Sequence, residues 1–81
     1  MTSIVNVTTL ARAGRMAQAR AEHEYTIQAQ TEPVDDVWEL RDAKDIFHSL
    51  TGEKYPSEND LWLVQDAYED AYYEKFEELK G

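Results

Sequence analysis

The fold is decided by the stretch SENDLWLVQDAYEDAYYEKFEELK, residues 57–80. At about 100° per residue, its larger apolar side chains fall within one stripe of about 120° on a helical wheel. That stripe consists of Leu61, Val64, Tyr68, Tyr72, Phe76 and Leu79. Ser57 is a candidate N-cap, and Asp60 imitates the third position of a capping box. The spacing predicts one amphipathic helix over 57–80 that ends at Gly81.

Two more helices are expected before it, so the fold class is all-α: a small three-helix bundle over about 9–30, 35–50 and 57–80. In the middle segment Asp36 and Glu39 match a capping box, and Gly52 is well placed to stop the helix. Its apolar face is formed by Leu40, Ala43, Ile46, Phe47 and Leu50.

The first segment leaves an alternative open. Thr8 or Thr9 would cap a helix whose small apolar face lets a neighbouring helix approach closely. That face consists of Leu10, Ala13, Ala17 and Ala21. However, residues 25–30 alternate with period two, and residues 3–7 are rich in β-branched side chains. An α+β fold with short strands near 3–7 and 23–30 is therefore the alternative.

The composition predicts one domain, residues 1–81, with room for a single small core. Hydrophobic residues make up 42% of the chain, too few for a core together with a deep catalytic cleft. The absence of cysteine excludes disulfides, thiolate metal sites and a cysteine nucleophile. The chain starts without a signal-peptide pattern and has no run of about 20 apolar residues. We therefore expect a cytoplasmic protein with no membrane contact.

The negative charge is confined to one part of the chain. The net charge is −9, but a neutral, alanine-rich segment, residues 1–33, carries three bases and three acids. The acidic, aromatic unit, residues 34–81, carries five bases and fourteen acids. Such a charge opposes direct binding to nucleic acid or anionic membranes and favours a basic protein partner.

The sequence offers little for catalysis. His23 and His48 fall in different segments, and only Asp45 stands at helical spacing from a histidine. A metal site in a helical bundle needs a second such pair with further carboxylates. There is no glycine-rich phosphate loop and no serine in a nucleophile context. We therefore expect no catalytic residue, no metal site, no cofactor and no enzymatic activity.

One feature of the last helix is unfavourable for the helix itself. Asp66, Asp70, Glu74 and Glu78 follow one another at intervals of four, with Glu77 beside them. We call these five residues the acidic ridge. Each like-charge pair four residues apart costs about 0.2–0.5 kcal/mol, so three pairs cost roughly 1 kcal/mol. The ridge is either a solvated face of an acidic protein or a binding surface.

Aromatic side chains flank the acidic ridge. Trp62 and Tyr73 lie beside Asp66 on the helical wheel, and Leu63 lies inside the acidic face. Large aromatic side chains surrounded by polar groups are typical of interface hot spots. Trp62 and Tyr73 are therefore candidate anchors for a partner. The alternative is that a second helix covers both of them.

A cysteine-free, compact, acidic chain with such a ridge resembles, as a class, the small phage-encoded inhibitors. These include many anti-CRISPR proteins and the DNA-mimic inhibitors of restriction or repair enzymes. The resemblance implies a stoichiometric inhibitor in the host cytoplasm that occupies a basic, nucleic-acid-binding groove of a larger bacterial protein. The neutral N-terminal third differs from a uniformly acidic mimic. The alternative is a self-associating helical adaptor, with Leu10, Ala13, Ala17 and Ala21 joining two copies.

Overall fold

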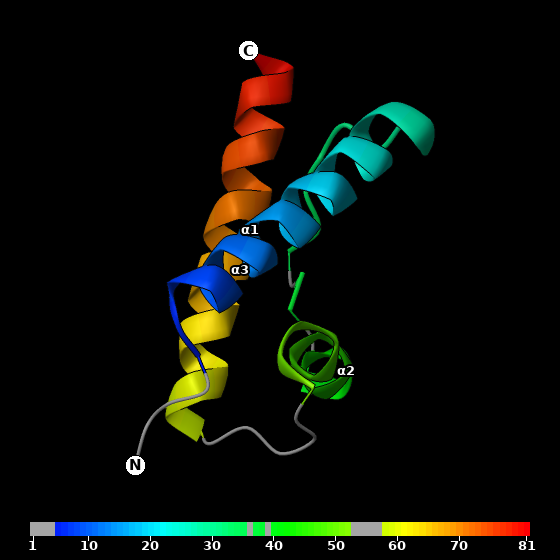
Figure 1. Cartoon of the computed structure of the whole chain (residues 1–81). Coiled ribbons are helices and arrows are strands. Elements are labelled where there is room, and N and C mark those ends of the chain that lie inside the picture. Colours follow the sequence, from blue (N-terminus) through cyan, green and yellow to red (C-terminus); the bar gives the residue numbers. More distant parts are fainter. Residues whose placement is uncertain (1–4, 36, 39, 53–57) are drawn as a thin grey trace.

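The computed structural model describes residues 5–35, 37–38, 40–52 and 58–81. In these ranges the chain forms α1 (Val7–Glu22), the π-helix η1 (His23–Ile27), α2 (Leu40–Thr51) and α3 (Glu58–Lys80). The described residues contain no strand, so the all-α prediction is confirmed. The strand alternative for 23–30 is wrong, because residues 23–27 are π-helical. In Figure 1, α1 crosses α3, and α2 is seen end-on beside them.

The long helix α3 follows the prediction closely. It covers Glu58–Lys80, with Glu58 and Asp60 in the first turn, where acids favour the helix dipole. At its end the Gly81 amide donates to the Glu77 carbonyl at 3.0 Å. Ser57, the expected N-cap, lies outside the described residues.

The first helix begins earlier than predicted and ends earlier. Its N-cap is Asn6, not Thr8 or Thr9: the Asn6 side-chain oxygen accepts from the Thr9 amide at 3.0 Å and from the Thr9 hydroxyl at 3.3 Å. After Glu22 the helix widens into η1, where the Gln28 amide donates to the His23 carbonyl at 3.1 Å. Ala29 then takes a left-handed conformation, with φ 57, so the helix does not reach residue 30.

The second helix begins at Leu40 rather than near residue 35. The residues before it belong to the core instead: Val37 and Trp38 are buried, and the Trp38 ring lies 5.4 Å from that of Tyr68. The capping box of Asp36 and Glu39 lies outside the described residues. Gly52 stops the helix as predicted, with a φ of 81 that favours glycine.

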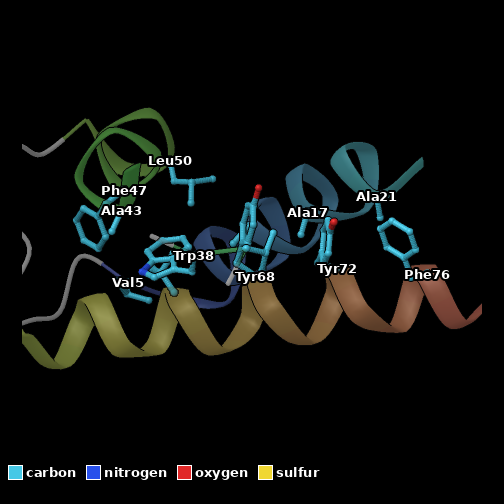
Figure 2. Packing of buried hydrophobic residues seen from close by; sticks show 13 residues of the cluster. Val5, Ala17, Ala21, Trp38, Ala43, Phe47, Leu50, Tyr68, Tyr72 and Phe76 are labelled. Carbon is cyan, nitrogen blue, oxygen red and sulfur yellow. The ribbon is translucent and has the colours of Figure 1, made fainter. Parts of the chain in front are cut away.

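The core is built from large side chains of α3 against small ones of α1 (Figure 2). Tyr68, Tyr72 and Phe76 are buried together with Val64, as the stripe predicted. Opposite them lie Ala13, Ala17 and Ala21, each with no exposed surface. From α2, Ala43, Phe47 and Leu50 complete this cluster.

The packing corrects one expectation. Three residues of the predicted dimer face, Ala13, Ala17 and Ala21, are covered within one chain, and Leu10 is packed at the edge of the same cluster. A face that is buried in the monomer cannot also join two copies. The predicted homodimer contact through these four residues is therefore wrong.

Two glycines give a matched test of the backbone. A Cβ at Gly14 would meet the Ala71 Cβ at 3.8 Å, an ordinary contact, whereas Gly52 has a positive φ. We expect Gly14→Ala to stabilise the protein by about 0.5–1 kcal/mol because alanine favours the helix interior. Gly52→Ala should destabilise it by about 1 kcal/mol. Urea unfolding measures both, and a destabilised Gly14→Ala would show that the α1–α3 approach is tighter than described.

Candidate protein-binding surface

The acidic ridge faces solvent over its whole length. Asp66, Asp70, Glu74, Glu77 and Glu78 are all exposed. They point outward because Val64, Tyr68, Tyr72 and Phe76 occupy the opposite side of α3 and are buried. With a rise of about 1.5 Å per residue, Asp66 and Glu78 lie about 18 Å apart along the axis. The structure thus presents a convex row of carboxylates that winds gradually around the outer face of α3, by about 40° for every four residues.

Few cations offset this charge. Lys75 lies 3.6 Å from a Glu22 carboxylate oxygen and 3.5 Å from one of Glu78. Lys80 lies 4.0 Å from Glu32, away from the ridge. In the described part of the chain, Asp66, Asp70 and Glu74 have no ion pair or side-chain hydrogen bond. The mutual repulsion of these three is therefore left uncompensated within the molecule.

Two apolar side chains are exposed at the N-terminal end of the ridge. Trp62 is 55% exposed and Leu63 43% exposed. Trp62 stands four residues before Asp66, and Leu63 stands three before it, so both are neighbours of that carboxylate on the helix surface. The structure therefore brings Trp62 to the same face as the acids, as the sequence predicted.

Tyr73 has a different role. Its hydroxyl shares a hydrogen bond between the carbonyl oxygens of Val34 and Asp35, at 2.9 and 3.0 Å. Its ring packs edge-on against Tyr72, with centroids 5.3 Å apart. Tyr73 thus holds the connection between η1 and α2 against α3, so we leave it out of the proposed surface. The segment that contacts Tyr73 is this non-helical connection, not the second helix that the alternative expected, and Trp62 stays exposed.

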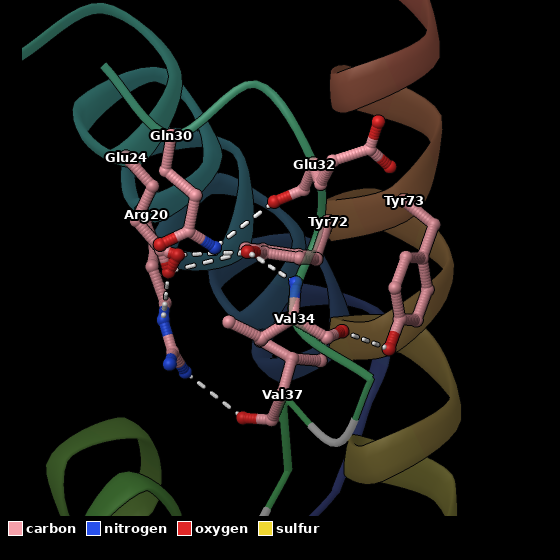
Figure 3. A network of polar contacts seen from close by, with 8 residues as sticks. All are labelled: Arg20, Glu24, Gln30, Glu32, Val34, Val37, Tyr72 and Tyr73. Atoms are coloured by element: carbon pink, nitrogen blue, oxygen red, sulfur yellow. Dashed lines mark hydrogen bonds and ion pairs between the residues drawn. The ribbon is translucent and has the colours of Figure 1, made fainter. Parts of the chain in front are cut away.

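A second cluster of polar groups lies inside the protein (Figure 3). The Tyr72 hydroxyl donates to the Glu24 carboxylate at 2.7 Å, and Arg20 Nε donates to the same group at 3.1 Å. A second Arg20 nitrogen donates to the Val37 carbonyl at 2.9 Å. The Val34 amide approaches the Tyr72 hydroxyl at 3.4 Å. The cluster links α1, η1, α3 and the connection between η1 and α2.

This cluster joins segments of the chain that are far apart in sequence. Glu24 is only 7% exposed, and in the described residues every buried side-chain nitrogen or oxygen has a hydrogen-bond partner. Such a satisfied network fixes neighbouring segments in place. The cluster was not predicted from the sequence, although one signal was present. Glu24 continues the alanine stripe three residues after Ala21, and a buried acid there requires a partner such as Arg20.

The described residues hold neither a metal site nor a membrane span. They contain no group of three or more His, Asp or Glu side chains able to hold a metal ion. None of their helices has both the length and the apolar character needed to cross a membrane. The comparisons with known proteins add no relative: no family model, curated protein or solved structure matches the chain.

Tyr72→Phe tests the buried cluster. We expect a loss of about 1.5–3 kcal/mol at neutral pH, because the Glu24 carboxylate loses a donor. Burial, and then the hydrogen bond to Glu24, raise the pKa of Tyr72 above its ordinary value. The phenol therefore stays protonated when folded but ionises in the unfolded chain above about pH 10.

The stability that this hydroxyl contributes is thus complete below about pH 10 and is lost as the pH rises further. Urea unfolding at several pH values should show the gap between wild type and Tyr72→Phe narrowing above that pH. Other titrating groups are common to both proteins and cancel in the difference. A gap that stays constant into strongly alkaline solution would contradict the assigned hydrogen bond.

Asp70→Asn tests the cost of the ridge. The change removes two like-charge pairs, with Asp66 and with Glu74, and should stabilise the protein by about 0.4–1 kcal/mol. The gain should shrink in high salt, because exposed charges are screened. The matched control, Glu32→Gln, removes the same charge from an exposed ion pair and should give no gain. Equal gains in both variants would mean that only the net charge matters.

Proposed function

We propose that the protein is a non-catalytic inhibitor whose acidic ridge occupies a basic, nucleic-acid-binding groove of a larger bacterial protein. One observation carries the proposal: five exposed carboxylates lie along one face of α3, and within the described structure four of them form no ion pair, Glu78 being paired with Lys75. The convex shape of a single helix suits a groove. An anti-CRISPR-like or DNA-mimic inhibitor of phage origin, acting in the host cytoplasm, is the class that this surface fits.

The arrangement of the ridge supports this reading in two ways. Carboxylates four residues apart recur about every 6 Å along a helix, an interval broadly similar to that of phosphates along a nucleic-acid strand. A groove lined with lysine and arginine for phosphates would therefore meet a comparable row of negative charge. The cations of the partner would also neutralise the like-charge repulsion within the row. Relief of this repulsion would add to the free energy of binding.

The alternative, a solvated face with no partner, leaves two observations without a reason. The helix keeps three like-charge pairs that cost roughly 1 kcal/mol together. It also exposes Trp62 and Leu63 next to them. A locally unfavourable choice with no internal compensation is typical of a functional site.

The test is charge reversal with a matched control. The ridge variant carries Asp66→Lys, Asp70→Lys and Glu74→Lys, and the control carries Glu32→Lys, Asp35→Lys and Asp45→Lys, three exposed acids off the ridge. Both variants have a net charge of −3 instead of −9. Immobilised wild type should retain, from a bacterial lysate at about 50 mM salt, a protein that added DNA or RNA releases.

Binding of that purified protein should be about 100-fold weaker for the ridge variant, since three charge pairs are lost at about 1 kcal/mol each. The control should bind nearly as well as wild type, and binding should weaken toward about 200 mM salt. Circular dichroism verifies that both variants are folded. Equal binding by ridge variant and control would place the interface elsewhere. Retained proteins that nucleic acid fails to release would refute the groove.

A further inference from the structure

Two observations on this molecule specify which nucleic-acid groove the ridge fits, an inference that rests on the proposed function. The first concerns α1, the helix that packs against α3 in the described structure. The outward residues of the neighbouring helix α1 include Arg12 and Arg15, which are exposed cations. A duplex carries two strands of phosphates, and α1 offers no second acidic row to imitate the other one.

The second observation is the exposed indole in line with the acids. Trp62 precedes Asp66 by four residues, the same step that separates Asp66 from Asp70 and Asp70 from Glu74. It is 55% exposed, whereas Trp38, the other tryptophan, is 4% exposed and packed against Tyr68. No hydrogen bond holds the Trp62 side chain within the described residues. A flat aromatic ring at the end of a row of negative charges has the chemistry of a nucleobase beside its phosphates.

Proteins that bind single strands combine a basic groove with aromatic side chains on which bases stack. A duplex keeps its bases stacked inside, so a groove for duplex phosphates has no need of such a platform. We propose that α3 occupies a groove built for single-stranded nucleic acid, with the Trp62 ring on a base-stacking platform and Asp66, Asp70 and Glu74 on the phosphate sites. Leu63 packs against the rim of the platform.

A second copy of the chain is the competing occupant of this face. The net charge of −9 on each copy opposes such a contact. A cationic groove with an aromatic platform complements both the charge and the exposed ring, which is why we assign the face to it.

Two peptides of equal length and charge serve as probes, one alternating lysine with tyrosine and the other alternating lysine with serine. Wild type should bind the tyrosine peptide about tenfold more tightly, as expected for one stacking contact of about 1.4 kcal/mol. Trp62→Ala should abolish this preference and Trp62→Phe should keep part of it. Because the side chain is largely exposed, both variants should fold. The tyrosine peptide should also protect wild type from acrylamide quenching of its exposed indole.

The ridge variant separates this inference from the proposed function. Reversal of Asp66, Asp70 and Glu74 should weaken both peptides alike, whereas Trp62→Ala should weaken only the tyrosine peptide. A peptide preference that is absent from wild type, or that survives in Trp62→Ala, overturns the role of Trp62 and leaves the ridge proposal standing. Binding that depends on Trp62 but is insensitive to the ridge variant overturns the proposed function.

The partner retained from lysate completes the test. Single-stranded DNA or RNA should displace the protein from it at a lower concentration than duplex of the same length. Equal or better displacement by duplex overturns the single-strand assignment. Sedimentation of the free protein should show a monomer at micromolar concentration, and a dimer that Trp62→Ala dissociates would assign this face to a second copy instead.

Discussion

The close approach of α1 to α3 determines the rest of the molecule. The small alanine side chains of α1 leave space for the rings of Tyr68, Tyr72 and Phe76. The large side chains of α3 fill this space. Close packing of this kind stabilises a small core that has few large aliphatic side chains. It also fixes the rotation of α3 about its own axis. Once the aromatic stripe faces α1, the carboxylates on the opposite side have no position except in solvent.

The buried polar cluster extends this constraint beyond the helices. Glu24 receives hydrogen bonds from Tyr72 and Arg20, and Arg20 in turn holds the Val37 carbonyl. A carboxylate buried without such donors would be strongly destabilising. These hydrogen bonds hold the connection between η1 and α2 against α3. The Tyr73 hydroxyl adds hydrogen bonds to the carbonyls of Val34 and Asp35 in the same connection. This connection covers the flank of α3 and leaves its acidic face open, which separates the structural side of the helix from the side that we propose for binding.

The sequence predicted those parts of the fold that depend on periodicity. The stripe from Val64 to Phe76 is buried as its spacing required, and Gly52 ends α2 because few other residues tolerate its φ. The errors arose where tertiary contacts override local signals. Trp38 enters the core instead of the first turn of a helix, and Asn6 caps α1 although Thr8 and Thr9 are equally plausible caps. For the ridge, the helical wheel places Trp62 and Tyr73 on one flank. Only the structure separates them, because the carbonyls that engage Tyr73 lie 38 and 39 residues away in sequence.

The like-charge repulsion along the acidic ridge affects the energetics of the proposed binding. Loops that become ordered on binding lose conformational entropy, and this loss reduces affinity. The backbone of α3 loses little conformational entropy, because the helix is already held by Tyr68, Tyr72 and Phe76 on its other side. The free protein instead carries electrostatic repulsion among Asp66, Asp70 and Glu74, and cations supplied by a partner would remove it. The helix would therefore meet the proposed cationic groove already ordered, because the small core holds its backbone in place.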